Sequence, residues 1–419
     1  MANQIKDPTD LELNKAEPLV MHIDLNSCYA ILEQQANPLL RHKPVGIAAY
    51  DSPRGFVLAA SYEAKRLGIN LMRVRDAKAI CPEIIILTPD PEKYFDAHRR
   101  FRAVLERYTS EVTPKSVDEF VVDFRGSRAL GDGRSLADVG YQIKKDIKKS
   151  LGEYVTVNIG IAPNRFLAKV AAGLHKPDGL DVITHKNLRD VYEKLELVDL
   201  PGINYRFKAR LNLAGIFTPL QFLDSQVFTL KKQVFHAITG YYWYLRLRGY
   251  EIDAEKFRTR SFGNDYSVGE KTDDPQKVAR LLMKLCEKTG RRLRKHDYQG
   301  QGIFLGLGFE NGAWWGKGNR TKTLLYSTQD IYFHALRLMR TVEFPARVTH
   351  INIAVYDVIP ASPIQLGLFD GTRWDTRSLT RSADKINDTY GEFTVVPASM
   401  ANMQNVIIKR VPFGSVRDI

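Results

Sequence analysis

The chain has 419 residues, of which 44% are hydrophobic and 10% aromatic, which is enough apolar material for two to four domains with cores. The formal net charge of +13 favours a polyanionic partner, most commonly nucleic acid, over a basic surface that serves only solubility. Three widely spaced cysteines, Cys28, Cys81 and Cys286, suggest neither a disulfide framework nor a zinc site and favour a reduced, cytoplasmic setting. No apolar run approaches the roughly 20 residues of a membrane span, and we expect no membrane partner.

The first half of the sequence alternates between strand-like and helix-like patterns. Residues 1–18 read as a polar, loosely ordered lead-in without the apolar core of a signal peptide. Short apolar runs predict strands at 19–25, 44–49, 55–60, 116–124 and 155–161. Helical spacing of apolar residues predicts helices at 62–67, 91–109, 135–150 and 164–175. The mixture predicts one α/β or α+β unit over residues 19–185.

The second half changes its pattern twice. Residues 186–250 are mainly helical around the sequence LPGI, and residues 251–360 predict a second, smaller α+β domain. In that domain strands are expected at 260–268, 302–310 and 350–358, with helices at 274–296 and 328–341. Residues 361–419 form a tail with a possible helix at 378–390, and no repeat or low-complexity tract is present.

Three acidic residues interrupt the apolar runs of the first unit. Asp24 ends the run LVMHIDL, and Asp118 and Glu119 stand within SVDEFVVDF. A carboxylate in such a run is costly to bury unless it is paired or binds a cation, and three of them suit Mg²⁺. Because neighbouring strand residues point to opposite faces, Asp118 and Glu119 can share a site only where the chain turns. Taken alone, the pattern favours the alternative of three solvent-exposed acids.

Four segments in order resemble the Y-family DNA polymerases. MHIDLNSCYA resembles the motif in which a strand-end Asp is followed five residues on by an aromatic, and SVDE resembles the family's Ser-Ile-Asp-Glu. ASYEAKRLGINLM is similar to its Ser/Asn-Tyr-Glu-Ala-Arg stretch, and GIAPNRFLAKVAAGLHKPDG to its Gly-Ile to Lys-Pro-Asp-Gly stretch. The resemblance covers about residues 20–370 and is to the bacterial polymerase IV and polymerase V catalytic-subunit type.

The resemblance implies a multidomain α+β fold shaped as a right hand. The palm plus fingers would span residues 19–185, with fingers inserted at about 28–90. A helical thumb with a helix–hairpin–helix would span 186–250, a C-terminal little finger 251–360, and a tail 361–419. The implied activity is a DNA-directed DNA polymerase specialised for translesion synthesis, which attaches dNTPs to a primer 3′-OH in DNA damage tolerance and the SOS response.

The resemblance also implies roles for single residues. Asp24, Asp118 and Glu119 match the catalytic acids, which with the backbone carbonyl of Leu25 would bind two Mg²⁺ ions. Tyr29 matches the steric gate against ribonucleotides, with an ordinary core tyrosine as the alternative.

The incoming nucleotide would be contacted by four residues in all. Besides Tyr29, the resemblance implies that Tyr62, Lys65 and Lys169 bind the dNTP. Lys65 stands where many relatives carry arginine, which keeps the charge and loses the planar fork.

DNA contacts are expected in two regions. DLPGINYRFKARLNLAGI, residues 199–216, resembles a helix–hairpin–helix in which Gly202, Ile203 and Asn204 present backbone N–H groups to a phosphate. We expect Asn204 to take the place of a glycine, because asparagine tolerates a left-handed backbone. The 258–360 region carries 17 Lys+Arg against 10 Asp+Glu, an excess of seven. The expected DNA-binding residues there are Arg258, Arg260, Arg291, Arg292, Arg294, Lys317, Arg320 and Lys322.

The tail contains a short peptide that resembles a known interaction motif. Gln365, Leu366, Leu368 and Phe369 match the Gln-Leu-x-Leu-Phe peptide that bacterial polymerases insert into the sliding clamp. The implied partners are primer–template DNA, dNTPs, the clamp, and a recombinase or another SOS accessory protein.

Two other classes of protein compete with an active polymerase. A polymerase-like adaptor would bind DNA and the clamp without catalysis, but such a protein would not need all three acids. A palm-domain cyclase can share the strand-borne acids, but it has no use for a helix–hairpin–helix or a basic second domain.

Overall fold

The structure is a computed structural model that describes residues 11–53, 55–254, 258–361, 376–401, 403 and 406. The chain divides into two compact units, one with the described residues up to 254 and one with those from 258. Each unit builds its own apolar cores. In the part of the chain that is described, no helix is both long and apolar enough to cross a membrane.

The first unit is organised around a five-stranded sheet with the order β5-β6-β1-β7-β8. Strand β1 lies at its centre and runs antiparallel to both neighbours, whereas β7 and β8 are parallel. The strand bounds are β1 Val20–Leu25, β5 Val112–Pro114, β6 Glu119–Asp123, β7 Val157–Ala162 and β8 Leu180–Val182. The predicted strands at 19–25 and 155–161 are therefore confirmed.

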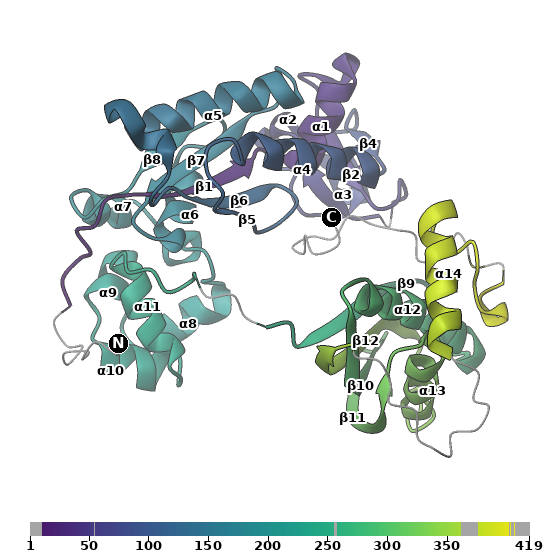
Figure 1. The fold of residues 1–419 in the computed structure, drawn as a ribbon. Helices are drawn as coiled ribbons and strands as arrows, with labels where there is room; N and C mark the ends of the chain where they lie inside the picture. Colours follow the sequence, from purple (N-terminus) through teal and green to yellow (C-terminus); the bar gives the residue numbers. More distant parts are fainter. Residues whose placement is uncertain are drawn as a thin grey trace. The chain divides into compact units, whose positions relative to one another are not determined.

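Helices cover both faces of this sheet (Figure 1). Helices α4 (Pro91–Leu105) and α5 (Leu136–Leu151) lie side by side on one face, and α6 (Arg165–Leu174) lies on the other. The alternation of strand side chains decides which residue meets which helix. Met21 and Ile23 belong to the α4–α5 core, whereas Val20 belongs to the α6 core. A short helix, η3 (Arg128–Gly133), precedes α5.

The chain segment that connects β1 to α4 forms a smaller layer with a three-stranded sheet of its own, in the order β3-β2-β4. It begins with α1 (Cys28–Ala36), which continues directly from β1. The remaining elements are η2 Pro38–Leu40, β2 Val45–Ala48, β3 Val57–Ala60, α2 Tyr62–Arg66, α3 Val74–Ile80 and β4 Ile85–Leu87. Gly68, with φ of 84°, ends the turn after α2.

Short helices complete the first unit after β8. They are α7 Leu188–Glu193, η4 Leu197–Asp199, α8 Tyr205–Leu213, α9 Pro219–Asp224, α10 Val227–Thr229, η5 Leu230–Val234 and α11 Thr239–Leu247. Their apolar side chains share one core with α6, so this helical layer lies on the face of the main sheet that α6 covers.

The N-terminal segment corrects one expectation. Described residues 11–18 are tied to α11 instead of being loosely ordered. The N–H of Asn14 donates to the carbonyl of Arg248 at 2.8 Å, and the Leu11 N–H donates to the Tyr244 hydroxyl at 3.2 Å. Leu11 and Leu13 pack against the helical core, which the largely polar composition of the segment conceals.

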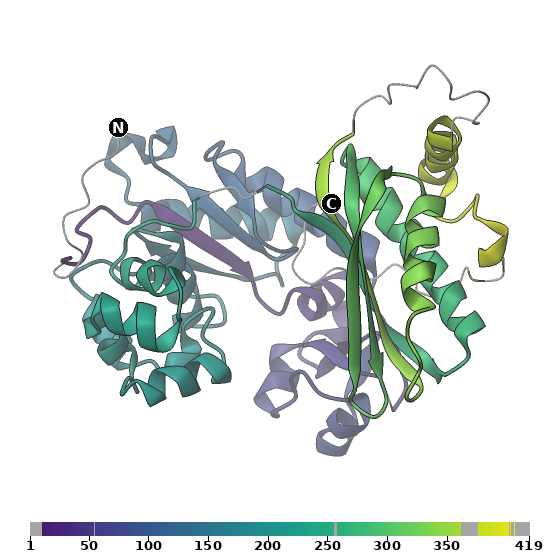
Figure 2. The same ribbon diagram turned by 90° about the horizontal axis from the view of Figure 1, so that it is seen from below.

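The second unit is a four-stranded antiparallel sheet, β11-β10-β12-β9, covered on one face by two helices (Figure 2). The bounds are β9 Ser261–Thr272, α12 Pro275–Lys295, β10 Tyr298–Phe309, β11 Trp314–Leu325, α13 Thr328–Met339 and β12 Val348–Pro360. Strand β11 was not predicted. Its sequence, WWGKGNRTKTLL, is polar because almost all of this edge strand is exposed.

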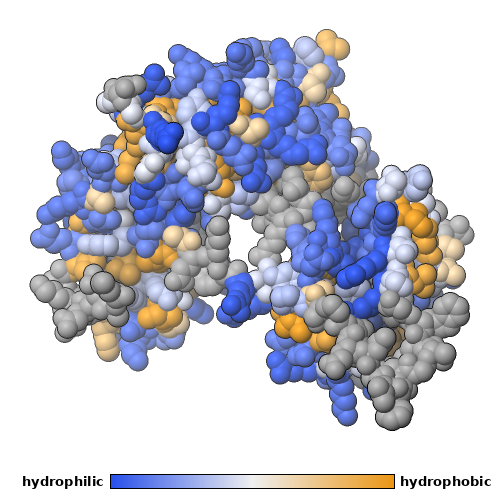
Figure 3. Space-filling model, in the orientation of Figure 1, coloured by the Kyte–Doolittle hydropathy of each residue, from blue (hydrophilic) through white to orange (hydrophobic). Residues whose placement is uncertain are grey.

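Helix α14 (Thr376–Tyr390) docks on this unit through its polar side. Arg294 of α12 holds Asp384 with two hydrogen bonds, of 2.5 and 2.9 Å, and Arg291 bonds Asp388 at 2.6 Å. The apolar residues Leu379 and Ile386 are exposed, and hydrophobic surface gathers along α14 in Figure 3. The predicted tail helix is thus confirmed, with its polar side as the docking side. A last short helix, η6 (Ala398–Met400), follows.

Candidate active site

The turn between β5 and β6 places Asp118 and Glu119 in different backbone settings. The N–H groups of Lys115 and Ser116 both donate to the carbonyl of Glu119, at 2.8 and 3.3 Å, and thereby close a tight hairpin. Glu119 begins β6, whereas Asp118 lies in the turn before it. The expectation that both acids stand inside a strand is therefore corrected, and the turn that a shared site requires is present.

Asp24 meets this hairpin directly. Asp24 and Glu119 are opposite partners in the β1–β6 register, and the N–H of Leu25 donates to the carbonyl of Asp118 at 2.9 Å. Opposite partners point to the same face of a sheet. The register therefore gathers Asp24, Glu119 and the turn residue Asp118 at one end of two central strands.

Each carboxylate has a partner of its own. The Lys176 ammonium contacts Asp24, and the Lys169 ammonium of α6 donates to both oxygens of Glu119 at 2.9 and 2.7 Å. The Ser116 hydroxyl donates to Asp118 at 2.5 Å. Lysine ammonium groups thus balance two of the three acids.

Burial and mutual repulsion set the acidities of this cluster. Burial raises the pKa of Asp24 against the opposing effect of Lys176, and Asp118 and Glu119 add to the rise. Burial likewise raises the pKa of Asp118, and the Glu119 charge contributes. Burial also acts to raise the pKa of Glu119, but Lys169, with contributions from His22 and Lys176, lowers this pKa overall. Neighbouring acids thus help to raise the pKa values of Asp24 and Asp118, so the cluster favours added positive charge.

The donor set fits a divalent cation. Carboxylate oxygens are the ligands that Mg²⁺ prefers, and here they come from two paired strands and the turn between β5 and β6. Among the described residues, no three acidic, histidine or cysteine side chains already stand together at metal-binding distance. Lys169 and Lys176 contact the carboxylates instead, so cation binding requires these two side chains to move.

Tyr29 lies on the first turn of α1, four residues after the end of β1. Its ring stacks on Tyr94 of α4, with ring centroids 4.5 Å apart, and it is 6% exposed. Burial raises the pKa of the Tyr29 hydroxyl. Neighbouring Cys28 is buried in the same core.

Tyr62 and Lys65 share the short helix α2. Ser61 caps this helix by accepting the N–H of Ala64, which fixes its first turn. The Lys65 ammonium donates to the Ser27 hydroxyl at 2.8 Å and lies 5.0 Å from the centre of the Tyr62 ring. Burial lowers the pKa of Lys65 and raises that of Tyr62 to about 12. The side chains of Tyr62 and Lys65 therefore lie together, next to the end of β1.

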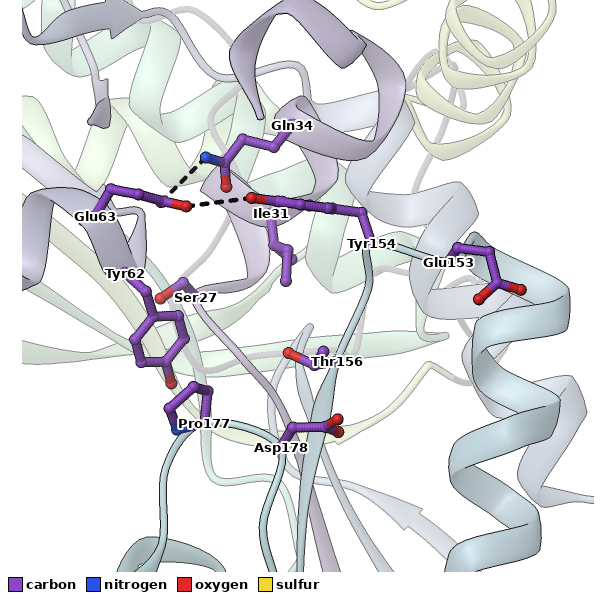
Figure 4. A pocket seen from close by; sticks show the side chains of 10 residues that line it. All are labelled: Ser27, Ile31, Gln34, Tyr62, Glu63, Glu153, Tyr154, Thr156, Pro177 and Asp178. Carbon is purple, nitrogen blue, oxygen red and sulfur yellow. Dashed lines mark hydrogen bonds between the residues drawn. The ribbon is translucent and has the colours of Figure 1, made fainter. Parts of the chain in front are cut away.

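A pocket of about 260 Å³ opens beside these residues (Figure 4). In this view Ser27, Tyr62 and Pro177 lie on one side, and Thr156 and Asp178 lie on the other. A hydrogen-bonded frame closes its far end, where the Tyr154 hydroxyl donates to Glu63 at 3.2 Å. The remaining lining residues are Ile31, Gln34 and Glu153.

Two residues at this site were missed by the sequence reasoning. Lys176 lies in the KPDG segment, which reads as a helix-ending turn and does not reveal that its ammonium reaches Asp24. His22 is buried 3.8 Å from Glu119, and burial lowers its pKa to about 3, so it stays neutral. Only the alternation along β1, two residues before Asp24, could have indicated His22.

The expected DNA-binding hairpin follows η4. Gly202 has a φ of 96°, and Ile203 is buried. Asn204 has an extended backbone, with φ of −94°, and its side chain caps α8 by accepting the N–H of Phe207. The expectation of a left-handed Asn204 is corrected, because a capping asparagine needs an extended backbone.

The basic residues of the second unit fall into two groups. Arg258, Arg260, Lys317 and Lys322 are exposed, and the exposed Arg320 pairs with Asp357 at 2.6 Å. Lys317, Arg320 and Lys322 lie within β11.

Three arginines of α12 are engaged within the unit. Arg292 donates to the carbonyl of Gly263 at 2.8 Å. Arg294 is only 7% exposed, and it and Arg291 bond α14. Their guanidinium groups are used inside the unit, and the expectation that Arg291 and Arg294 bind DNA stays a prediction. The clamp-like peptide Gln365–Phe369 lies outside the described residues.

Solved structures show the class of protein that this fold defines. A Y-family DNA polymerase chimera of Dbh and Dpo4 is similar with a TM-score of 0.71 and 26% identity, over 81% of this chain and 99% of that one. A ternary complex of Dbh DNA polymerase shares the fold at a TM-score of 0.57 and 24% identity, over 82% and 99%. The fold is that of a Y-family DNA polymerase, with the predicted right-hand architecture.

Sequence comparisons give the family. Residues 23–173 match the impB/mucB/samB family, and residues 259–368 match its C-terminal domain. DNA polymerase IV of Moorella thermoacetica is 31% identical over 386 residues, which are 89% of this chain and 94% of that protein. DNA polymerase IV of Pelotomaculum thermopropionicum is 30% identical over 404 residues, 93% and 97% of the two chains. The chain therefore belongs to the impB/mucB/samB family of bacterial polymerase IV-like, Y-family DNA polymerases.

Proposed function

We propose that this protein is a template-directed DNA polymerase that attaches dNTPs to a primer 3′-OH and is specialised for translesion synthesis. The observation that carries the proposal is the convergence of Asp24, Asp118 and Glu119 at one end of the central strands. Membership of a family whose relatives are named DNA polymerase IV supports it. In a bacterium this substrate places the protein in the cytoplasm.

The three acids are the proposed holders of two Mg²⁺ ions, joined by the backbone carbonyl of Leu25. Bound divalent cations supply activation of the primer hydroxyl and charge stabilisation of the phosphates. Lys169 and Lys176, which now neutralise Glu119 and Asp24, become available for phosphate oxygens once the carboxylates are otherwise balanced.

The remaining residues of the site bind the nucleotide in this proposal. Tyr62 and Lys65 approach from α2, and Lys169 and Lys176 from the side of α6. A triphosphate between these elements would be met by three ammonium groups, which suits its charge. Tyr29, wedged against Tyr94, is the proposed barrier to a ribose 2′-OH.

The second unit and the hairpin at Gly202 are the proposed DNA-binding parts. Phosphate contacts by the exposed Arg258, Arg260, Lys317 and Lys322 do not depend on sequence, which suits an enzyme that accepts any template. The sliding clamp, through Gln365–Phe369, and SOS accessory proteins remain predicted partners.

Primer extension tests the proposal. Wild-type protein with Mg²⁺, dNTPs and primer–template should extend the primer, and Asp118→Ala should lower the rate by about 10³-fold or more. Glu106→Ala, which removes an exposed acid paired with Arg102, is the matched control and should extend normally. A wild-type protein that binds primer–template without extending it would support the adaptor instead. An Asp118→Ala variant as fast as wild type would refute the assignment of the acids.

A further inference from the structure

The loop that carries Lys176 is short and tightly folded. Residues 175–179, HKPDG, connect α6 to β8. Asp178 has a φ of 59°, and a Cβ on Gly179 would lie 2.1 Å from the carbonyl oxygen of His175. Because the loop backbone is this tightly folded, we expect it to move as one piece together with Lys176. The groups that bond the loop therefore determine where the Lys176 ammonium lies.

One buried amide pair bonds the loop on both sides of Lys176. The Asn26 side chain donates to the Asn158 side-chain oxygen at 2.9 Å, and the two residues are 1% and 0% exposed. The oxygen of Asn26 accepts the N–H of Asp178 at 3.0 Å. The amide of Asn158 donates to the carbonyl of His175 at 3.0 Å, and its oxygen accepts the N–H of Gly179 at 3.4 Å.

The two asparagines lie at neighbouring strands of the main sheet, where both can reach the loop. Asn26 directly follows β1 and the catalytic strand end, and Asn158 lies in β7, the next strand of the sheet. Buried amides are costly unless they are hydrogen-bonded, and in a low-dielectric interior satisfied amides hold one geometry. From the opposite side, Lys144 and Lys148 of α5 bind Asp178, at 3.0 and 3.4 Å.

We propose that Asn26 and Asn158 are positioning residues, which hold the 175–179 loop so that the Lys176 ammonium stays at the catalytic end of β1. The inference rests on the proposed polymerase function. It adds that part of the affinity for the nucleotide triphosphate depends on two neutral, buried amides that do not touch the nucleotide. Their contribution passes through Lys176. Figure 4 shows Pro177 and Asp178 of the same loop lining the pocket, with Pro177 beside the Tyr62 ring.

A double-mutant cycle tests this coupling. The dissociation constant of dNTP is measured on complexes with Mg²⁺ and a dideoxy-terminated primer–template for wild type, Lys176→Met, Asn158→Leu and the double variant. Loss of the ammonium should weaken binding about tenfold, and Asn158→Leu should weaken it by a smaller factor. The double variant should bind within about twofold of Lys176→Met alone, because the effects of coupled residues do not multiply.

Asn164 provides the matched control. It is also 1% exposed, and its side chain also bonds backbone carbonyls, those of Arg246 and Tyr250, but not the 175–179 loop. Any effect of Asn164→Leu should therefore multiply with that of Lys176→Met. Multiplying effects for Asn158→Leu as well would overturn the proposal.

A second measurement needs no nucleotide and separates the two claims. Amide hydrogen exchange at Asp178 and Gly179 should accelerate at least about tenfold in Asn158→Leu and stay unchanged in Lys176→Met. Unchanged exchange in Asn158→Leu would overturn the positioning role even if the protein is an active polymerase. A wild-type protein that extends no primer refutes the proposed function, while exchange still decides what holds the loop. If Asn158→Leu does not fold, Asn158→Asp replaces it, since it keeps both acceptor contacts and loses the donor to His175.

Discussion

At the scale of single residues, the sequence predicts the chemistry of the site better than its contacts. The three acids are predicted because carboxylates are rare in apolar runs and recur in a family motif. Lys176 escapes prediction because a lysine in KPDG has the pattern of a turn, and its approach to Asp24 depends on two buried asparagines far away in sequence. The burial of Arg294 also escapes prediction, because a cluster of basic residues does not show which of them is buried.

Tyr29→Ala should admit ribonucleotides. The buried ring stacks on Tyr94, so its removal leaves space beside the proposed sugar position. Discrimination against rNTPs should fall by about 100-fold, the order of selectivity that a site shape gives against one added hydroxyl. Single-nucleotide incorporation of dNTP and rNTP measures the ratio. Tyr141→Ala, at an exposed tyrosine of α5, is the control, and an unchanged ratio in Tyr29→Ala would remove the gate assignment.

At the scale of elements, apolar strands and amphipathic helices are predictable, and edge elements are not. Strand β1 and helix α6 follow from their own hydrophobic patterns. Strand β11 does not, because its partner β10 and not its own composition fixes it as a strand. Helix α14 shows its periodicity plainly, but the pattern suggests burial of the apolar side, whereas buried arginines of α12 select the polar side.

Arg294→Met should destabilise the second unit strongly. Removal of Arg294 leaves the largely buried Asp384 charge with only Arg291, at 3.9 Å, as a cationic neighbour, and the loss of such a partner costs about 3 kcal/mol. Arg189→Met, which breaks an exposed pair with Asp224, should cost less than about 1 kcal/mol. Urea denaturation measures both. The double variant Arg294→Met/Asp384→Leu should recover part of the loss, and equal stability of Arg294→Met and wild type would contradict the docking described here.

Substitutions of Asn204, the cap of α8, test whether its backbone is extended, because the sign of the stability change in a glycine variant depends on that conformation. Asn204→Ala should destabilise the first unit by about 1 kcal/mol, because the N–H of Phe207 loses its acceptor. Asn204→Gly should also destabilise, by a few tenths of a kcal/mol, since the extended backbone at this position has no need of glycine. Thermal or urea unfolding measures the change. A glycine variant more stable than wild type would mean that the turn needs a left-handed residue after all.

At the scale of the whole molecule, positive charge should determine the affinity for DNA. The 258–360 region has an excess of seven basic residues, yet several of its arginines are engaged in contacts within the unit. The number of released counterions should therefore be smaller than the number of basic residues. Net charge predicts the kind of partner from sequence, and only the contacts show which charges remain available.

Salt dependence measures this difference. Replacing Lys317, Arg320 and Lys322 together by glutamine should reduce the slope of log affinity against log salt by about two, not three, at about 0.9 per released phosphate contact. Arg320 counts for less because it is held by Asp357. Fluorescence anisotropy with primer–template at several salt concentrations gives the slope. An unchanged slope would remove β11 from the DNA-binding surface.

Gln299 links chain segments on both sides of residues 362–375. Its amide donates to the carbonyl of Pro360 at 3.3 Å, and Arg377 donates to its oxygen at 2.6 Å. Together with the salt bridges of Arg294, this contact holds the two flanks together without help from the peptide chain between them. A protein cut at a protease site engineered into residues 362–375 should therefore migrate as one particle in native gel filtration and as two polypeptides in denaturing electrophoresis. The covalent connection could be exchanged for other peptides while the segment from residue 376 to 403 stays in place.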